Sequence, residues 1–593
     1  MMAQLTRSLA GFMVRAKEAA MPGRIRRALG LIGVAAIVAA CGSSTPSAVP
    51  TANGPTASAV ASASAGPTGT AVLSASPSAS PSFDPYASPS AAVAALAYPQ
   101  RTVFVQLFEW KWTDIANECE QWLGPHGFAA VQISPPNEHA VIDTATNQFP
   151  WWERYQSVSY QLESRSGTRT EFADMVKRCR AAGVEIYADV ILNHMTAGSG
   201  TGSAGTVYTK YSYPGLYGPA DFHANANPAY PKILCDHSIS DFSDPTEVRT
   251  CELDGLADLR TEEPKVQNAL AAYMADLYSL GVRGYRIDAA KHIDQSQLAT
   301  ILSKLRAKLP AGATFFVDQE VTDFGGDAVP KDLYYPTGSV DDFIYTADIT
   351  AAFTHTDETV STLQTLDSAA FIGPSEKSVV FTDNHDSQRG HVGTGLILSY
   401  KRKDVYALAN VFMLAYPFGY PRVMSSFVFS DTEAGPPSDA QGRTNSIYPA
   451  GGGAPNCGLA AGQWVCEQRW HAIAGMVGFR DFTASAPAVT NWWSNPSDGN
   501  QVAFGRGSAG GGTGGSASGA GFVVINRSTS PLSQTLQTGM APGTYCDVVG
   551  GDLAAGAASC TGVAVTVGAA GTAHFEVPPM QAIAIHVGAR IAG

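Results

Sequence analysis

The central part of the chain alternates short β-rich runs with stretches of helical periodicity, and this alternation restricts the fold more than any other feature. Apolar runs bounded by Gly, Pro or Asn lie at 102–107, 129–133, 185–192, 285–288, 315–320 and 379–383. Residues 169–182 and 266–280 instead place apolar side chains at helical spacing. Strands joined by helical crossovers form parallel sheets, and a segment of this length predicts an α/β fold that closes into a TIM (β/α)8 barrel.

Two segments depart from this alternation. Residues 195–257 form a long irregular stretch after the run at 185–192, and we expect a small inserted domain there because ordinary connections are much shorter. Beyond residue 487 the helical periodicity stops, and short β-rich runs predict a C-terminal antiparallel β-domain. These runs lie at 501–504, 522–526, 543–549, 563–567 and 582–587. We therefore expect the barrel at 99–487 and the β-domain at 488–593.

The N-terminal segment has the pattern of an export signal. Basic residues at 24–27 precede an apolar run at 28–40, which is shorter than the roughly 20 residues that span a membrane. The run ends in Val-Ala-Ala-Cys-Gly, which resembles the bacterial lipobox, where the chain is cut before a cysteine that is then acylated. We expect residues 1–41 to be a lipoprotein signal with Cys41 as the acylated residue. An ordinary signal with an incidental cysteine is the alternative, and Met21 could be the true start.

Residues 42–98 form the next segment, a tether of Ser, Ala, Pro, Thr and Gly that cannot bury enough apolar surface to fold. Only Asp84 is charged between Arg27 and Arg101, which helps to explain the low charged fraction of 15%. The net charge of −13 argues against nucleic acid as a partner. We expect an exported monomer that contacts the outer face of the membrane through its lipid alone, or a secreted protein.

Nine cysteines are present, and the count becomes even once Cys41 is set aside. An even number in an exported chain predicts disulfides, although eight cysteines allow about 105 pairings. The close couples suggest local loops and leave the two most N-terminal of the eight to pair with each other. The expected bonds are Cys119–Cys179, Cys235–Cys251, Cys457–Cys466 and Cys546–Cys560. A structural zinc site is the alternative, but no CxxC or HxxxH spacing favours it.

Acidic, His and Arg residues gather where four of the expected strands end, which is where TIM barrels place catalytic groups. The segments are DVILNH at 189–194, GYRIDAAKH at 284–292, VDQEV at 317–321 and FTDNHD at 381–386. One Arg-x-Asp pair or one strand-end His is usually structural. Four clusters in order strongly resemble the signature regions of the α-amylase family of glycoside hydrolases.

Four further segments extend the resemblance to animal-type and actinobacterial α-amylases, from about residue 101 to the C-terminus. They are FEWKW at 108–112, SPPNE at 134–138, WWERYQ at 151–156 and RVMSS at 422–426. The resemblance implies a TIM barrel with an inserted domain after the third strand and a C-terminal β-sandwich. It also implies an endo-acting enzyme that hydrolyses internal α-1,4-glucosidic bonds of starch, glycogen and maltooligosaccharides with retention of configuration.

Three carboxylates correspond to the catalytic residues of the family: Asp288 to the nucleophile, Glu320 to the acid/base and Asp386 to the transition-state stabiliser. Retention requires two carboxyl groups about 5–5.5 Å apart. Arg286 lies two residues before Asp288, so on a strand both side chains face the same way and the guanidinium would keep the nucleophile ionised. Glu320 follows an apolar strand, where partial burial favours the protonated form of a general acid.

The resemblance also implies a set of substrate contacts. They are Trp151, Trp152, Tyr155, Gln156, His194, Arg286, Lys291, His292, His385 and His391. Trp151 and Trp152 could be core aromatics, but adjacent residues of a strand cannot both face inward, and their polar neighbours favour a sugar-stacking platform.

Within this set the positively charged and imidazole side chains have distinct expected tasks. The strand-end residues His194 and His385 would donate hydrogen bonds to the sugar at subsite −1. Lys291 and His292 would hold the next glucose. The segment 390–395, with His391, resembles the mobile loop at the cleft in this family.

Two ions follow from the same resemblance. Asn193, Asp258 and the carbonyl oxygens of Arg249 and His292 match the calcium site of the family, and calcium prefers several oxygen ligands. The chloride-dependent members use two arginines and an asparagine, which match Arg286, Asn384 and Arg422 here. A chloride near Glu320 would help to keep that acid protonated, because a like charge disfavours ionisation.

Departures from the family are few. Phe242 stands where animal-type members carry an active-site tyrosine, so contacts of the inserted domain with substrate are in doubt. We expect no appended starch-binding module after residue 593, and we expect soluble chains to be better substrates than raw granules. A glucan transglycosylase with the same three carboxylates and a non-catalytic glucan-binding protein are the alternative functions.

Overall fold

The computed structural model describes residues 97–592, apart from 145, 225–234, 236, 356, 394, 509–518 and 555–556. The described residues belong to one compact unit. The expected signal, the expected acylation at Cys41 and residues 42–96 of the expected tether lie outside the described residues. Within the described ranges, no helix combines the length and the apolar character that a membrane crossing requires.

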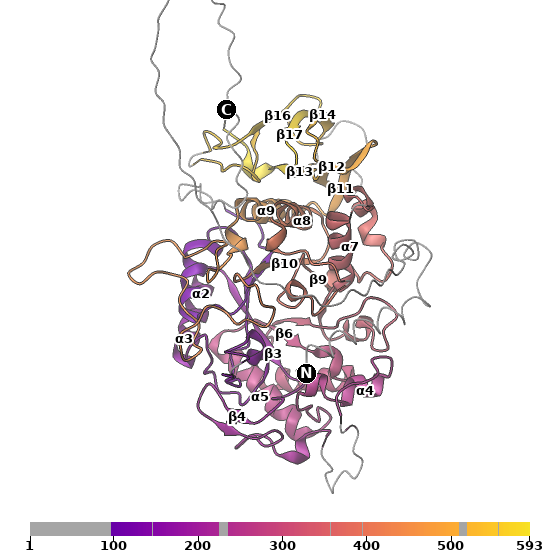
Figure 1. The fold of residues 1–593 in the computed structure, drawn as a ribbon. Coiled ribbons are helices and arrows are strands. Elements are labelled where there is room, and N and C mark those ends of the chain that lie inside the picture. The colour runs from indigo at the N-terminus through magenta and orange to yellow at the C-terminus, as the bar shows by residue number, and fades with distance from the viewer. Residues whose placement is uncertain are drawn as a thin grey trace, which may run out of the picture. The chain divides into compact units, whose positions relative to one another are not determined.

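Eight parallel strands close into a barrel in the order β1-β10-β9-β8-β7-β6-β3-β2, which confirms the predicted fold class (Figure 1). The strands are β1 (Phe104–Leu107), β2 (Ala130–Ile133), β3 (Glu185–Ile191), β6 (Gly284–Asp288), β7 (Phe316–Gln319), β8 (Ser339–Asp341), β9 (Ser378–Val380) and β10 (Tyr420–Ser425). Every residue of β1 and β2 is buried, as expected for parallel strands covered on both faces.

Helices connect the strands on the outside of the barrel. They are α2 (Trp112–Glu118), α3 (Arg169–Ala181), α5 (Pro264–Leu280), α6 (Gln295–Lys308), α7 (Phe343–Thr354), α8 (Asp404–Ala415) and α9 (His471–Phe482). The helical periodicity at 169–182 and 266–280 corresponds to α3 and α5. A capping box at Thr168 and Glu171 starts α3, and Gly281 ends α5 with a left-handed φ of 112°.

The expected insertion follows β3, the third strand of the barrel. It contains β4 (Gly200–Thr201), β5 (Val207–Tyr208) and α4 (Pro245–Thr250) around a core of aromatic rings. Two contacts tie its ends together. One is an isolated bridge between His194 and Asp258, and the other is a backbone hydrogen bond of 2.9 Å from Leu259 to Asn193. The insertion therefore begins and ends directly above the carboxyl end of β3.

The C-terminal domain is antiparallel, as predicted. A sheet in the order β11-β12-β13-β18 is accompanied by the pairs β14–β17 and β15–β16. Their bounds are β11 (Ala488–Asn495), β12 (Asp498–Gly507), β13 (Gly521–Asn526), β14 (Leu532–Gln537), β15 (Gly543–Cys546), β16 (Ala564–Val567), β17 (Thr572–Val577) and β18 (Gln581–His586). The sequence runs had not indicated β11, β14 or β17.

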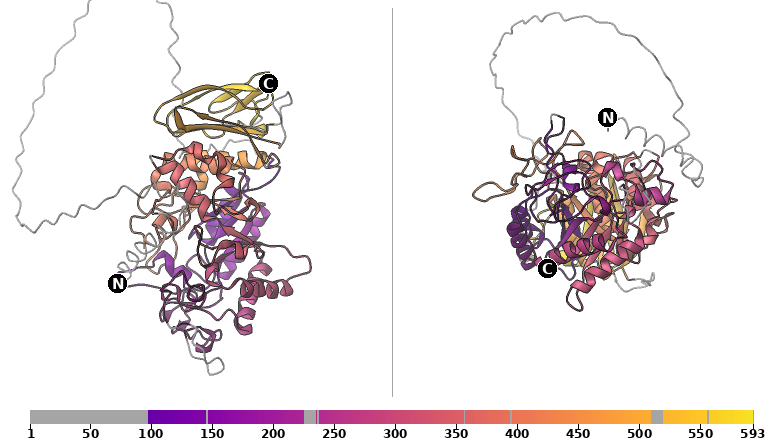
Figure 2. Two further views of the ribbon diagram at one scale, coloured as in Figure 1. Left: turned by 90° about the vertical axis from the view of Figure 1, so that its right-hand side faces the viewer. Right: turned by 90° about the horizontal axis from the view of Figure 1, so that it is seen from below.

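Strand alternation explains how this domain packs on the barrel. In β13, Phe522 and Val524 face a core shared with β14 and β17, which makes the domain a two-layered sandwich. Val523 and Ile525 point to the opposite face and join the main core with α8 and α9. The left view of Figure 2 shows the sheet beside these helices.

All four expected disulfides are present, namely Cys119–Cys179, Cys235–Cys251, Cys457–Cys466 and Cys546–Cys560. Each cysteine sulfur among the described residues is therefore already bonded, and the zinc alternative is wrong for them.

Candidate active site

Arg286 is the centre of a buried cluster of carboxylates at the carboxyl ends of β3, β6 and β7. Its Nη1 donates to Asp189 at 2.9 Å and to Asp288 at 2.7 Å, while its Nη2 lies 3.0 Å from Oε1 of Glu320. The parallel register places Asp189 beside Arg286, and the alternation along β6 turns Arg286 and Asp288 to the same side. One guanidinium thus positions the expected nucleophile and the expected acid together.

Glu320 is held from its other side by the chain that follows β6. The backbone N–H of Ala289 donates to Oε2 of Glu320 at 2.8 Å, and the N–H of Glu320 donates to Ile287 at 3.0 Å. Ala289 adopts a left-handed φ of 49°, an uncommon conformation outside glycine that aims its N–H at this carboxylate. Both oxygens of Glu320 therefore have defined partners.

Asp386 joins the cluster from the segment after β9. Its backbone N–H donates to Oδ1 of Asn384 at 3.1 Å, and its Oδ2 lies 3.2 Å from Nε2 of His385. Burial, followed by the charge of Glu320, raises the pKa of Asp386 to about 7. Burial likewise raises the pKa of Asp288, and Arg286 only partly opposes this. Burial therefore favours the protonated forms of Asp288 and Asp386, while the charge of Arg286 favours their ionised forms.

His385 is fixed between two aromatic rings. It stacks on Phe108 with ring centroids 4.7 Å apart and on Tyr155 at 5.1 Å. Gln106 donates to its Nδ1 at 3.1 Å, which places the ring proton on Nε2 beside Asp386. Burial holds the pKa of His385 well below its ordinary value, so the ring is neutral. His385 is thus a neutral ring whose Nε2 faces Asp386.

His194 is held at the cluster by a hydrogen bond to the protein backbone. Its Nε2 donates to the carbonyl of Tyr155 at 3.1 Å and lies 4.0 Å from Oδ2 of Asp288. Burial lowers the pKa of His194 to about 4, so the ring carries one proton only. Nδ1 is buried and has no hydrogen-bond partner in the described part of the chain. Nδ1 of the neutral ring is therefore left as a free acceptor.

The two expected stacking tryptophans lie on a 3-10 helix, Trp151–Tyr155, and not on a strand. The argument from strand alternation therefore does not apply to them. Trp151 packs near the rings of His385 and His391, and its Nε1 donates to Thr432 at 2.9 Å. Trp152 is less buried, and its Nε1 donates to Glu433 at 2.8 Å.

The rest of this segment is anchored to the barrel and the insertion. Tyr155 donates from its hydroxyl to Asp189 at 3.1 Å, which connects it with the carboxylate cluster. Gln156 accepts from the N–H of Ala197 at 3.0 Å and so holds the start of the insertion. A fully buried ion pair between Arg154 and Glu109, at 2.8 Å, anchors this 3-10 helix to the segment that follows β1.

Three further expected substrate contacts come from the segments that follow β6 and β9. Lys291 donates from Nζ to the carbonyl of Thr322 at 2.5 Å and lies 3.4 Å from Asp327. His292 turns its Nδ1 to the carbonyl of Val248 at 2.8 Å and is buried. His391 is exposed, with Nε2 3.7 Å from Oε1 of Glu433.

Several residues of the site had no role assigned from the sequence. Asp189 lay in a recognised segment, and its contact with Arg286 could have been inferred from the pairing of β3 with β6. Arg389 donates to the carbonyl of His385 at 2.6 Å and lies over the ring of Trp151 at 5.2 Å. Glu433 contacts both Trp152 and His391. No sequence pattern connects Arg389 or Glu433 to the site.

Phe242, which stands where animal-type members carry a tyrosine, is half-buried against the core.

The expected calcium ligands come from three segments that meet beside the site. Asn193 donates from Nδ2 to Oδ1 of Asp258 at 3.0 Å, and His223 lies 2.5 Å from Oδ2 of the same carboxylate. The hydrogen bond from His292 to Val248 brings His292 next to the residue that precedes Arg249. A carboxylate, an amide oxygen and two carbonyl oxygens form the donor set that calcium prefers. Burial also raises the pKa of Asp258 to about 6, which fits a carboxylate suited to a cation.

The expected chloride ligands have unused donors. In the described ranges, the buried Nε of Arg286, Nε of Arg422 and Nδ2 of Asn384 have no hydrogen-bond partner. Buried donors without partners are costly unless something accepts from them. These three N–H groups suit a small anion.

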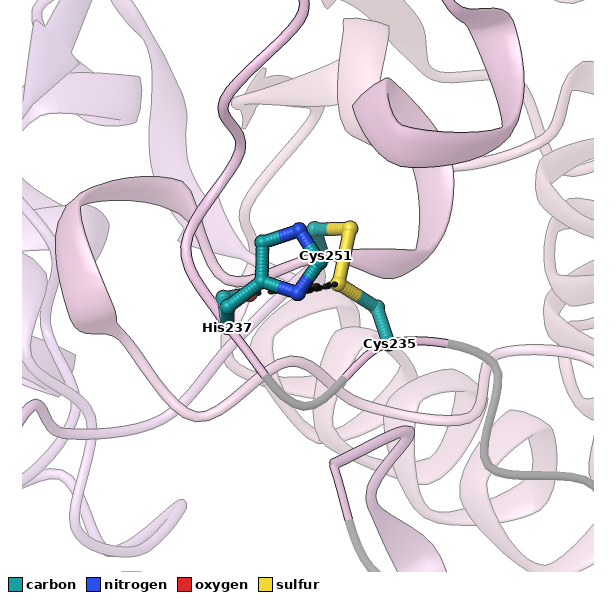
Figure 3. Close-up of side chains that lie close together, drawn as sticks. All are labelled: Cys235, His237 and Cys251. Carbon is teal, nitrogen blue, oxygen red and sulfur yellow. Dashed lines mark hydrogen bonds between the residues drawn. A yellow bond between two sulfur atoms is a disulfide. The ribbon is translucent and has the colours of Figure 1, made fainter.

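Cys235, His237 and Cys251 form the other candidate for a metal, since their ligand atoms lie within 4.8 Å of one another. Figure 3 shows that the two cysteines are joined by a disulfide, with His237 beside it. Disulfide sulfurs are not thiolates and do not ligate a metal. This group is therefore a cross-link of the insertion and not a metal site.

Comparison with known proteins identifies close relatives. Residues 127–319 match the family described as alpha amylase, catalytic domain, and residues 492–588 match alpha amylase, C-terminal all-beta domain. The alpha-amylase of Tenebrio molitor is 42% identical over 508 residues, covering 83% of this chain and 98% of the relative. Pancreatic alpha-amylase of Sus scrofa is 40% identical over 503 residues, covering 80% and 92%.

Solved structures agree with these relatives. The crystal structure of alpha-amylase I from Eisenia fetida matches with a TM-score of 0.72 and 37% identity, covering 84% of this chain and 99% of that chain. A variant of the same enzyme in complex with maltohexaose matches with a TM-score of 0.72 and 36% identity.

Proposed function

The chain belongs to the α-amylase family and is a glycoside hydrolase, and from this premise we propose that Asp288, Glu320 and Asp386 carry its reaction. The observation that supports this assignment is the position of Arg286, whose guanidinium contacts Asp288 at 2.7 Å and Glu320 at 3.0 Å. A retaining mechanism needs a nucleophile and an acid close together and fixed relative to each other. The alternatives of transglycosylation and glucan binding without catalysis have no observation in their favour.

In the first step Asp288 attacks the anomeric carbon of an α-1,4-linked glucan. Its Oδ1 is engaged by Arg286, which leaves Oδ2 as the attacking oxygen. Glu320 gives its proton to the glycosidic oxygen as the bond to the leaving sugar breaks. The product is a glycosyl ester of Asp288, and the configuration at the anomeric carbon is inverted once.

In the second step Glu320, now ionised, takes a proton from water, and the water oxygen displaces Asp288 from the anomeric carbon. The second inversion restores the original configuration, and the proton returns to Glu320. Asp386 binds hydroxyls of the distorted sugar, and since its pKa is about 7 it can donate or accept near neutral pH. The neutral rings of His194 and His385 complete these contacts from two sides.

We propose that the protein contacts the glucan on both sides of the bond that is broken. Trp151, Trp152 and Tyr155 form the wall on one side, supported by Gln156. Lys291 and His292 lie toward the other side, and His391 approaches from the exposed segment after β9. An endo-acting enzyme requires contacts of this kind on both sides, because it binds the interior of a glucan.

We also propose one calcium ion and one chloride ion as cofactors. Asn193, Asp258 and the carbonyl oxygens of Arg249 and His292 would hold calcium, which joins the insertion to the barrel. Arg286, Asn384 and Arg422 would hold chloride, whose negative charge favours the protonated form of Glu320.

The location of the enzyme is a separate proposal that depends on the N-terminal sequence. We propose that the protein is exported and attached to the outer face of the membrane through a lipid on Cys41. Its test is Cys41→Ala in the full chain: activity should move from the membrane fraction to the medium. Membrane-bound activity in the variant would contradict the lipid anchor.

The reaction itself is tested with maltoheptaose and purified protein in the presence of calcium and chloride. Proton NMR should show shorter maltooligosaccharides whose new reducing ends are first α-anomers. Products longer than maltoheptaose would favour the transglycosylase, and no turnover would contradict the enzyme. Asp288→Asn should be folded by circular dichroism but inactive. Retained activity would show that the nucleophile is wrongly assigned.

A further inference from the structure

Two further carboxyl groups, Asp318 and Asp341, lie inside the barrel beneath the proposed catalytic residues. Asp318 belongs to β7 and precedes Glu320 by two residues, so both face the barrel interior. Asp341 ends the neighbouring strand β8. Their exposed fractions are 1% and 0%. The reaction proposed above uses neither of them.

Arg422 on β10 contacts both groups. Its Nη1 lies 3.2 Å from Oδ2 of Asp318 and 3.1 Å from Oε1 of Gln132, and its Nη2 lies 3.0 Å from Oδ1 of Asp341. Nε of the same arginine is one of the donors left without a hydrogen-bond partner in the described ranges. The single positive charge of Arg422 is therefore shared between two carboxyl groups and the proposed anion site.

The charges around this pair do not balance if both carboxyl groups are ionised. The charged groups that face it are Arg422 from β10, Arg286 from β6 and Glu320 after β7. Arg286 is already engaged by Asp189, Asp288 and Glu320. Burial and then the charge of Asp341 raise the pKa of Asp318 well above its ordinary value. Burial also raises the pKa of Asp341. Paired carboxyl groups in such surroundings share a proton.

We propose that Asp318 and Asp341 hold one proton and one negative charge between them, and that this charge is a built-in counter-ion to Arg422 that weakens anion binding by Arg286, Asn384 and Arg422. The inference rests on the chloride site proposed above. A carboxylate within a few ångströms of a bound anion repels it strongly, because the barrel interior screens charge poorly. The enzyme would then need a higher chloride concentration than a barrel without this pair.

A shared proton makes a distinctive prediction for substitutions. Replacing one partner with asparagine leaves the other carboxyl group next to Arg422, where it is ionised, so the net charge of the pair stays the same. Only the double variant Asp318→Asn/Asp341→Asn removes the negative charge. The effects of the single variants therefore do not add up to the effect of the double variant.

The experiment measures chloride binding directly, by isothermal titration calorimetry of the calcium-loaded full chain in chloride-free buffer at pH 7. The control is Asp342→Asn, since Asp342 is equally buried but pairs with Lys331 at 2.6 Å, and asparagine can still cap α7. Circular dichroism and thermal melts check that each variant is folded.

We expect the double variant to bind chloride at least about tenfold more tightly than the wild type, and each single variant to stay within about threefold of it. Asp342→Asn should match the wild type. A double variant that binds chloride as the wild type does would overturn the inference, and so would single variants that each bind as tightly as the double variant. If neither the wild type nor any variant binds chloride, the chloride site itself is wrong.

Discussion

Nη1 of Arg286 donates a hydrogen bond of 2.7 Å to Oδ1 of Asp288, two residues further along the same strand. The other terminal nitrogen, Nη2, reaches Glu320 on the neighbouring side of the barrel at 3.0 Å. The side chain that orients the proposed nucleophile therefore also orients the proposed acid. Loss of the planar guanidinium should disturb both groups at once.

The first prediction concerns Arg286→Lys. An ammonium group cannot reproduce the fork that contacts three carboxylates, so kcat on maltoheptaose should fall by roughly 100-fold or more, whereas KM should change only a few-fold. The control is Arg283→Lys, whose guanidinium stacks on Tyr278 at 4.1 Å outside the site. Equal losses of kcat in both variants would show that the effect of Arg286 is structural.

The second prediction concerns the pH dependence of stability through Glu467. Burial raises the pKa of this carboxyl group to about 8. The native state therefore binds a proton that the unfolded state releases at lower pH, and the native state loses stability as pH rises toward 8. Glutamine resembles the protonated carboxyl group. At pH 8 the free energy of unfolding of Glu467→Gln should therefore exceed that of the wild type by about 2 kcal/mol or more.

Urea unfolding at pH 5 and pH 8 measures this difference. At pH 5 the variant and the wild type should be nearly equal, because Glu467 is protonated in the folded protein. The exposed Glu376→Gln should leave the pH profile unchanged. An equal difference between Glu467→Gln and the wild type at both pH values would contradict the prediction.

The third prediction concerns chloride. Dialysis into chloride-free buffer should lower kcat, and added chloride should restore it. Asn384→Asp retains an acceptor for the N–H groups of Asp386 and Ser387 but replaces the Nδ2 donor with a charged oxygen. The response to chloride should therefore disappear in this variant. Wild-type activity that does not change on removal of chloride would argue against the anion site.

The fourth prediction concerns calcium. Removal with a chelator should lower the melting temperature, because a ligand at 100 times its Kd stabilises the native state by about 2.7 kcal/mol. Asp258→Asn should lose this calcium-dependent shift. Asp254→Asn is the matched control, since asparagine tolerates the left-handed φ of 50° at this position of the insertion. A calcium-dependent shift that persists in Asp258→Asn would remove this residue from the ligand set.

Much of the fold could be predicted from local patterns. The β-rich runs and helical stretches indicated the barrel because most of its strands are apolar runs bounded by turn residues. β8 was missed since three residues carry no periodicity, and no β-rich run had been assigned to β10. In the C-terminal domain β17 alternates buried and exposed residues, a signal that could have been recognised, whereas β14 buries only its Leu532 and Leu536.

The site was predictable only where its residues lie in the recognised segments. Asp288 ends β6 and Glu320 directly follows β7, so their meeting place follows from barrel closure. The contact of Arg389 with His385 and the pairing of Glu433 with Trp152 depend on how loops fold over the barrel. The Asp318–Asp341 pair depends on the register of β7 against β8, which the sequence of either strand alone does not indicate.

The central claim is that Asp288 forms a covalent bond with the sugar while Glu320 exchanges the proton. Glu320→Gln should be incubated with a 5-fluoro-α-maltosyl fluoride, whose fluoride leaves without an acid and whose ester is slow to hydrolyse. Mass spectrometry of the digested protein should find the sugar on the peptide that contains Asp288, attached to that residue. A sugar attached to Asp189, Asp386 or any other residue, or fluoride release without labelling of the protein, would contradict the account.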